Sequence, residues 1–317
     1  MNWREPQVYA VKHSNSQIRA ASRSGGIFTA ISDVVLENDG VIYGCVLTED
    51  FEAIHIRATA TEDRNRMRGS KYIQSNMGDV FQSVKTDLDD GKQVLFSGTS
   101  CQVAGLKGFL RKEYDNLICV DIVCHGVPSP RVWKEYLKWQ EERNGKKIKS
   151  VDFRNKKDHG WAAHVESLYF DDETRVDSKV FKTLFYRHAI LRPCCYKCPY
   201  KQIMHPGDIS IADYWGIDKA APGFNDNKGV SLVLINNDTG RKFFDAACEN
   251  IEYRECDIKD SMQMSFIKPY ARPDNRDNFW SDFNKAPFTH IAKKYGDFGL
   301  KNDILNVLRN IKKKLVR

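Results

Sequence analysis

The sequence predicts an α/β fold: a mixed, partly parallel sheet flanked by helices, with a C-terminal helical extension. Short apolar runs bounded by glycine and polar residues alternate with stretches of helical periodicity, a pattern typical of α/β proteins. Between residues 94 and 123 a strand, a helix and a second strand follow one another, as in a βαβ unit with parallel strands. Near the C-terminus, residues 300–311 repeat apolar side chains at helical spacing ahead of three lysines.

The composition favours a cytoplasmic protein without a membrane span. At 317 residues and 41% hydrophobic content, the chain can bury a full core as one large α/β domain or two. No run approaches the roughly 20 apolar residues of a membrane helix, and Met1–Ala10 lacks the apolar core of a signal peptide. The net charge of +7 favours anionic partners, although a solvated surface with a Lys-rich tail would give the same excess. We expect no nucleic-acid partner.

The N-terminal part predicts a turn that can bind phosphate. A strand at 7–12 is followed by Ser24, Gly25 and Gly26, and then by an amphipathic helix from Ile27 to Val35 with Ser24 as its N-cap. Free backbone N–H groups at a helix start attract phosphate, and the two glycines allow a ligand to approach the backbone closely. An ordinary capped helix would have the same residues.

A second polar turn, residues 67–74, lies between two helical stretches. Two cations there flank a Gly-Ser pair, with an aromatic ring beside them. This mixture suits a phosphate joined to a flat ring system, although a solvated basic turn would look the same. The residues concerned are Arg68, Gly69, Ser70, Lys71 and Tyr72.

Two cysteines end the strands of the predicted βαβ unit. An apolar run and a polar loop, Ser97–Ser100, precede Cys101, and the second apolar run ends on Cys124. Parallel strands place their carboxyl ends at one edge of the sheet, where open α/β sheets bind ligands. If the two strands are neighbours, both thiols lie at that edge. Cys45 and Cys119 lie inside predicted strands, and we expect them in the core.

The remaining elements follow from the same signals. Pro130 at the first helical position and Ser129 as N-cap predict one helix start. Strand pairs, buried apolar runs and helical periodicity predict the others. We expect helices at 77–88, 102–111, 131–142, 181–191 and 239–248, a hairpin of 148–154 with 162–170, and strands at 41–47, 53–58, 208–213 and 231–235.

A Cys-x-x-Cys sequence, Cys195 to Cys198, supplies two more thiols that can hold one metal centre. With Cys101 and Cys124 they make four thiolates. Zinc, an iron–sulfur cluster and a catalytic thiol all remain open on chemistry alone. A structural zinc site usually uses two such paired motifs, and only one exists here, which favours the cluster. In a reducing compartment disulfides are not expected.

Two longer motifs resemble a known family. The runs Gly98–Leu106 and Asp121–Ser129 are similar to hallmarks of the coenzyme F420 hydrogenase/dehydrogenase beta-subunit family, F420 being a deazaflavin hydride carrier. The likeness spans roughly residues 7 to 250. Four further segments match in the same order: Ser24–Gly26, Arg68–Gln74, Arg192–Cys198 and Asp208–Gly216.

The resemblance implies an FAD- and 4Fe–4S-dependent oxidoreductase that passes electrons between a hydride carrier and iron–sulfur centres. It implies cluster ligands at Cys101, Cys124, Cys195 and Cys198. The implied FAD contacts are Ser24, Gly25, Gly26, Arg68, Gly69, Ser70, Lys71 and Tyr72. Three positions depart from the family pattern: Ser100 replaces a usual proline, Ala212 a usual glycine, and Cys194 a usual serine that could compete with Cys195 as ligand.

The expected partners also come from the resemblance. Most relatives begin with a ferredoxin-like segment that this sequence lacks, so we expect a separate ferredoxin-like electron-transfer protein and an anionic hydride carrier of deazaflavin or nicotinamide type. The alternative is a non-catalytic subunit or assembly module whose four cysteines bind zinc. We expect a flavin-binding half at 1–90, a cluster-bearing domain at 91–250 and a basic helical extension at 251–317.

Overall fold

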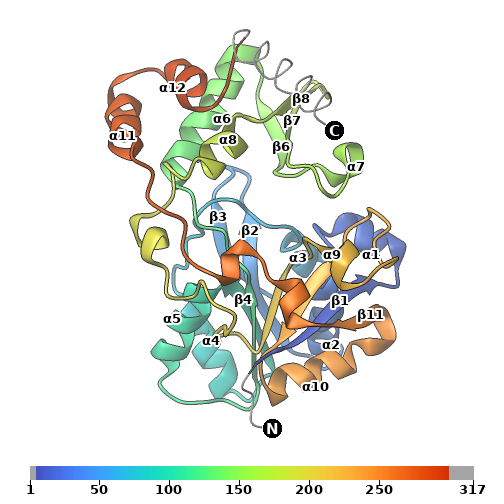
Figure 1. Ribbon diagram of the computed structural model, residues 1–317. Coiled ribbons are helices and arrows are strands. Elements are labelled where there is room, and N and C mark those ends of the chain that lie inside the picture. Colours follow the sequence, from blue (N-terminus) through green and yellow to red (C-terminus); the bar gives the residue numbers. More distant parts are fainter. Residues whose placement is uncertain (1–4, 300–317) are drawn as a thin grey trace. The chain divides into compact units, whose positions relative to one another are not determined.

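The computed structural model describes residues 5–299, which form two compact units that interleave along the chain (Figure 1). The large unit comprises the chain up to Gly126, Lys156–Ala162 and Lys197–Pro269. The small unit comprises Val127–Asn155, Ala163–Tyr196 and the chain from Tyr270 on. The three consecutive segments expected from the sequence stay a prediction. No helix of residues 5–299 is long and apolar enough to cross a membrane.

The large unit is built on an eight-stranded mixed sheet with the order β11-β1-β10-β9-β5-β4-β2-β3. Neighbouring strands β2, β4, β5 and β9 run parallel, and the other pairs are antiparallel. This confirms the mixed, partly parallel sheet. The strands are β1 Gln7–His13, β2 Val41–Leu47, β3 Ala53–Ala58, β4 Val94–Thr99, β5 Leu117–Ile122, β9 Ile209–Asp213, β10 Ser231–Ile235 and β11 Ile251–Cys256.

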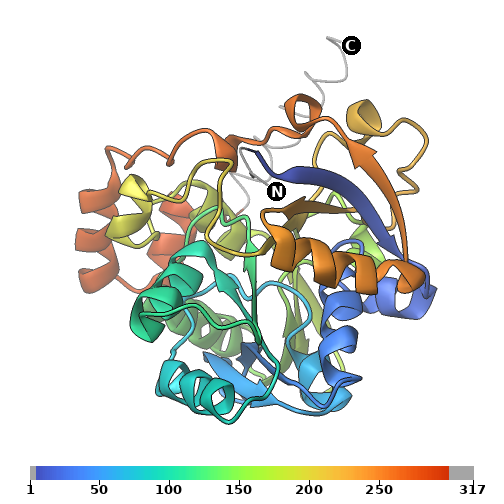
Figure 2. The ribbon, with the colours of Figure 1, turned by 90° about the horizontal axis from the view of Figure 1, so that it is seen from below.

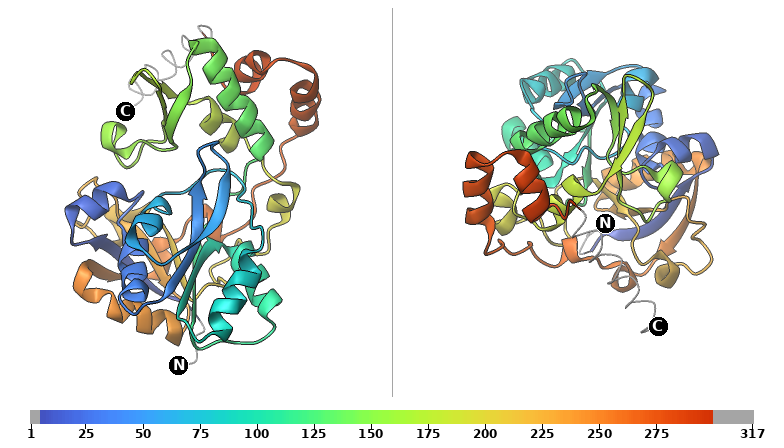
Figure 3. Two further views of the ribbon diagram at one scale, coloured as in Figure 1. Left: turned by 180° about the vertical axis from the view of Figure 1, so that it is seen from behind. Right: turned by 90° about the horizontal axis from the view of Figure 1, so that it is seen from above.

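Helices cover both faces of this sheet because its strands alternate apolar side chains between two cores. On one face α2 and α10 lie side by side (Figure 2) over residues such as Val11, Leu95 and Ile118. On the other face α4 and α5 (teal in Figure 3, left) pack on Phe96 and Cys119, which confirms Cys119 as a core residue. The helices are α1 Ser16–Ala21, α2 Ile27–Leu36, α3 Thr61–Arg66, α4 Val80–Asp89, α5 Ser100–Leu110, α7 Lys156–His159, α9 Ile217–Ala220 and α10 Asp238–Ala246.

The small unit combines a three-stranded antiparallel sheet with helices. Trp133 of α6 packs its ring against Phe153 and Phe181, so the aromatic residues of the predicted helix form the core of this unit. The predicted helix start is confirmed, with Ser129 at the N-cap and Pro130 in the first turn. The elements are α6 Pro130–Asn144, β6 Ile148–Asp152, β7 Glu166–Phe170, β8 Arg175–Ser178, α8 Val180–Tyr186, α11 Arg276–Lys285 and α12 Phe288–Tyr295.

Several boundaries differ from the expected ones. Strands β6 and β7 pair as predicted, but the residues between them include α7, which belongs to the large unit. Helix α8 ends at Tyr186 rather than Leu191, and shortly after it His188 takes a φ of 63°, which a helix does not permit. Strands β8 and β11 were not predicted. The C-terminal helical part is present in α11 and α12, whereas the predicted helix at 300–311 lies outside the described residues.

A buried acid in the small unit makes stability depend on pH. Glu166 is fully buried in β7, where Oε1 accepts a hydrogen bond from the Lys182 N–H and Oε2 has no partner among the described residues. Burial raises the pKa of Glu166 from 4.5 to about 8. Between these values the folded chain keeps a proton that the unfolded chain releases, so unfolding becomes easier as pH rises.

We therefore expect the melting temperature of the wild type to fall between pH 5 and pH 8, and Glu166→Gln to flatten that fall. The amide keeps an acceptor for the Lys182 N–H and never ionises. Thermal unfolding followed by circular dichroism at several pH values measures the effect. Glu142→Gln, on the exposed face of α6, is the matched control and leaves the slope unchanged. Equal slopes in the wild type and Glu166→Gln would contradict the prediction.

Candidate functional site

Cys101 and Cys124 lie at the same edge of the large sheet, as predicted. Strands β4 and β5 are adjacent and parallel, with Thr99 opposite Ile122, and each cysteine follows its matched residue by two positions. We call this edge, where β4, β5 and β9 end, the carboxyl edge. The local structure around Cys101 differs from the predicted loop, because α5 begins at Ser100 and places Cys101 in its first turn. A helix start favours negative charge, which suits a thiolate.

The segment after Cys198 is tied to both of these strand ends. The Lys201 ammonium donates hydrogen bonds to the backbone oxygens of Cys124 and His125. Further along, His205 Nδ1 lies 2.9 Å from Asp121 Oδ2 and 3.2 Å from Ser100 Oγ. All of these residues belong to the large unit.

The other two cysteines of the motif belong to the small unit. Cys194 and Cys195 lie in a 3-10 turn, Pro193–Lys197, whereas Cys198 is part of the large unit. All nine cysteines have free thiols. Within residues 5–299 no group of three or more His, Cys, Asp or Glu side chains is arranged to hold a metal ion. The four-thiol centre of Cys101, Cys124, Cys195 and Cys198 therefore stays a prediction.

The glycine turn before α2 has a different geometry from the one expected. Gly26, at φ 96°, is the N-cap of α2, so the prediction that Ser24 caps the helix is wrong. The Ser24 hydroxyl instead donates to the Val230 carbonyl. A Cβ at Gly25 would lie 2.0 Å from the Val11 carbonyl oxygen, so glycine here permits packing against β1. The bare start of α2 keeps backbone N–H groups available for an anion.

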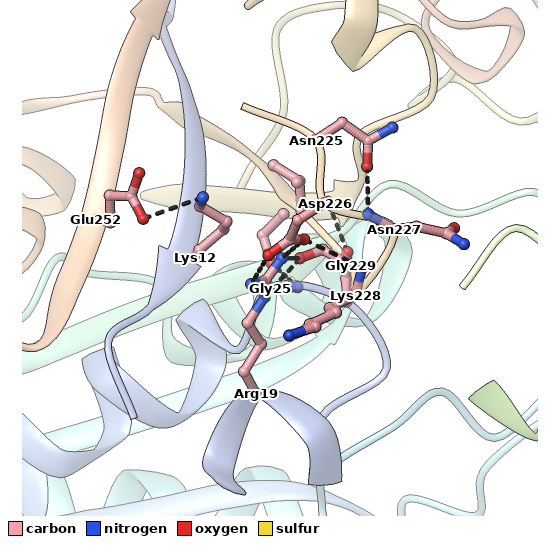
Figure 4. Close-up of polar contacts among 12 residues, drawn as sticks. Lys12, Arg19, Gly25, Asn225, Asp226, Asn227, Lys228, Gly229 and Glu252 are labelled. Carbon is pink, nitrogen blue, oxygen red and sulfur yellow. Dashed lines mark hydrogen bonds and ion pairs between the residues drawn. The ribbon is translucent and has the colours of Figure 1, made fainter. Parts of the chain in front are cut away.

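Ion pairs fix the neighbouring helix α1 beside this turn (Figure 4). The Arg19 guanidinium binds both carboxylate oxygens of Asp226, at 2.5 and 2.6 Å, and donates to the Gly229 carbonyl at 2.9 Å. Lys156 Nζ donates to the Arg19 carbonyl at 2.7 Å. Two-point contacts of this kind hold a loop in one geometry, so the approach to Gly25 and Gly26 is rigid.

The basic turn of residues 67–74 meets α2 through Thr29. Arg68 Nε donates to Thr29 Oγ1 at 3.0 Å, and Arg64 donates to the Thr29 carbonyl and pairs with Asp33 at 2.6 Å. The structure thus brings together the two segments that the sequence marked for phosphate. Lys71 is engaged within its own turn, because its Nζ donates to the carbonyl of Arg68 at 3.1 Å. Burial lowers the pKa of Lys71 to about 8. Gly69 and Ser70 are exposed, and Tyr72 is half-buried.

Sequence analysis missed His13, the last residue of β1. This side chain is 6% exposed and lies against Gly26, where an added Cβ would be 3.0 Å from the His13 Cβ. The Asn15 N–H donates to His13 Nδ1 at 3.0 Å, so the neutral ring carries its proton on Nε2. Nε2 is buried and has no partner among the described residues. A buried donor without an acceptor needs one, and a single histidine at a strand end gives no sequence signal.

The pKa of His13 is lowered, first by burial and then by Arg68 and Arg64, against the opposing effect of Asp33. The ring is therefore held neutral as a single-proton donor. The start of α2, the His13 Nε2–H and the Arg68 guanidinium form a cluster of donors in the large unit. We call this cluster the anion cradle.

A tryptophan pair lies at the end of β9, the strand next to β5. Trp161 is buried and stacks on Trp215 with ring centroids 5.1 Å apart and 13° between the planes. Its Nε1 donates to Asp213 Oδ1 at 3.1 Å, and Arg23 donates to its carbonyl. Trp215 is 41% exposed. The sequence left Trp161 between loop packing and shielding a cofactor; the stack orients it at the carboxyl edge.

The comparisons with known proteins agree with this architecture. A family model that describes the C terminus of the coenzyme F420 hydrogenase/dehydrogenase beta subunit matches residues 91–261, more than half of the 317 residues. Among solved structures, a chain from the F420-reducing [NiFe] hydrogenase complex of Methanosarcina barkeri, studied by xenon derivatization, is 17% identical, with 79% of this chain and 82% of that chain covered. The TM-score is 0.55, which shows a shared fold. No curated protein matches.

Proposed function

Because the chain belongs to the coenzyme F420 hydrogenase/dehydrogenase beta-subunit family, we propose that it is an oxidoreductase that binds FAD and a 4Fe–4S cluster. FAD accepts a hydride as two electrons, and a 4Fe–4S cluster passes electrons singly to an iron–sulfur partner. The observation that carries the proposal is that one sheet presents the anion cradle beside β1 and two free thiols at the ends of β4 and β5. The hydride carrier is an anion of deazaflavin or nicotinamide type.

The anion cradle suits the diphosphate of FAD. Backbone N–H groups at the start of α2, the His13 Nε2–H and the Arg68 guanidinium are the donors that a diphosphate accepts. Of the implied FAD contacts, Gly26 and Arg68 donate directly, whereas Ser24, Gly25 and Lys71 hold their turns in shape. Gly69, Ser70 and Tyr72 are left to face the ring or ribose part of the flavin.

The thiols suit a cluster held by four cysteines. Cys101 and Cys124 lie on adjacent strand ends, Cys198 belongs to the same unit, and Cys195 is the fourth implied ligand. All four are free, as ligands must be. Cys101, in the first turn of α5, is the most exposed of the four. Cys194 is exposed as well and stands beside Cys195 in the chain, so it is the competing donor.

Cofactor content is the direct test. Protein purified without oxygen is expected to contain about four iron and four sulfide atoms per chain, as a cubane cluster requires, together with about one FAD. Iron, sulfide, zinc and extracted flavin are measured on the same sample. Stoichiometric zinc without iron or flavin would instead assign the chain to the alternative function, a non-catalytic module with a structural zinc site.

Turnover is expected to depend on a ferredoxin-like partner and on salt. The chain carries a net charge of +7 and would attract an acidic electron-transfer protein, an effect that salt screens. We expect the rate with ferredoxin to fall several-fold as ionic strength rises from about 0.05 to 0.5 M, since the Debye length shortens severalfold over such a range. The control is an uncharged two-electron acceptor, whose rate does not follow salt. Full turnover that is indifferent to both ferredoxin and salt would contradict the prediction.

A further inference from the structure

A buried lysine holds its charge at one of the predicted cluster ligands. Lys201, three residues after Cys198, is 7% exposed. Its ammonium donates to the carbonyl oxygen of Cys124, to that of His125 at 3.1 Å and to Ser265 Oγ at 3.3 Å. Three acceptors match the three donors of an ammonium group. All three are uncharged oxygens.

The surroundings keep this charge in place. Cys124 directly follows the β5 strand end, so the Lys201 contact is made at the backbone of the predicted ligand. The same segment is anchored a second time, where buried His205 contacts Asp121 of β5 and Ser100 at the start of α5. The ammonium therefore cannot swing into solvent as a surface lysine does. Burial also protects its field from screening by salt.

Hydrogen bonding alone does not account for a lysine here. A glutamine amide or a hydroxyl can donate to backbone carbonyls, and burying it costs less than burying an ammonium. A chain that needed only a tether would not require the charge. What the charge adds is an attraction for negative charge that develops beside Cys124.

We propose that Lys201 sets the reduction potential of the iron–sulfur centre by holding a positive charge next to the ligand Cys124. The inference rests on the proposed function. One electron delivered to the centre adds one negative charge, and a nearby cation stabilises the reduced form more than the oxidised form. Lys201 thereby raises the potential and favours electron transfer from reduced flavin to the cluster. Lys201 is a positioning residue that acts through its field and its hold on Cys124.

The test is a redox titration of the reconstituted protein with dithionite, followed by EPR of the reduced cluster. Lys201→Gln keeps amide donors and removes the charge, Lys201→Arg keeps the charge, and Lys112→Gln removes an exposed charge just before the amino end of β5, away from the carboxyl edge. At the wild-type midpoint, Lys201→Gln is expected to lower the ratio of reduced to oxidised cluster at least tenfold, or about 59 mV for one electron. Lys201→Arg and Lys112→Gln are expected to change it less than threefold.

Each outcome decides the matter. A ratio unchanged in Lys201→Gln, or lowered equally in Lys112→Gln, overturns the inference. If Lys201→Gln fails to hold iron, melting of the metal-free protein decides: an unchanged melting temperature supports a charge requirement, and a lowered one assigns Lys201 to folding alone. Wild-type protein without iron would defeat the proposed function itself, which is distinct from a wild-type cluster whose potential ignores Lys201.

Discussion

Cys101→Ala and Cys124→Ala are each expected to lose nearly all iron and the brown colour of anaerobically purified protein. Each removes one of four thiolates at the predicted centre, and a cubane with a missing ligand exposes iron to solvent and loss. The two thiols end adjacent parallel strands, so neither substitution disturbs the sheet itself. Iron and sulfide content, with visible absorbance, measure the effect.

Two other cysteines are the matched controls for this prediction. Cys119, buried in β5, and Cys45, half-buried in β2, both have a thiol pKa raised chiefly by burial and are not predicted ligands. Cys119→Ala and Cys45→Ala should retain full iron. Iron retained in Cys101→Ala, or lost equally from Cys119→Ala, would contradict the ligand assignment.

Gly26→Val is expected to abolish flavin binding, and Arg68→Ala to weaken it. Gly26 has a φ of 96°, where a β-branched residue is strained, and its new side chain would meet His13 and block the start of α2. Arg68→Ala removes a charge-assisted hydrogen bond of about 1.5–3 kcal/mol, which is roughly a tenfold to hundredfold loss of affinity. Fluorescence titration of flavin-free protein with FAD gives the dissociation constants.

His13→Ala removes the buried Nε2 donor and is expected to weaken FAD binding by a similar route, although a neutral donor contributes less than Arg68. Arg66→Ala is the matched control, because Arg66 lies two residues from Arg68 in sequence and forms its ion pair with exposed Asp63. Full flavin affinity in both Arg68→Ala and His13→Ala would place the diphosphate elsewhere.

Local signals in the sequence located most elements of the fold. The apolar run at 94–96 and its glycine-containing ending predicted β4, and Pro130 after Ser129 predicted the start of α6. The strands that were missed are those without an apolar signal. β11 is mostly exposed at the sheet edge, with the burial pattern of a surface segment, so nothing in Ile251–Cys256 distinguishes it from a loop.

The sequence by itself determined which thiols and which basic turn belong to the candidate site. Cys101 and Cys124 followed from two strand endings, since parallel neighbours necessarily end at one edge. Gly26 and Arg68 followed from residue type. These inferences needed only local pattern and the geometry of a βαβ unit.

The tertiary structure decided what chemistry surrounds those residues. His13 meets Gly26 only because β1 lies beside the turn before α2, and Lys201 reaches Cys124 only because the chain after Cys198 folds back onto β5. Arg68 joins α2 through Thr29, far from it in sequence. Such contacts depend on burial and on which donor finds which acceptor across the fold, and no periodicity or spacing along the chain records them.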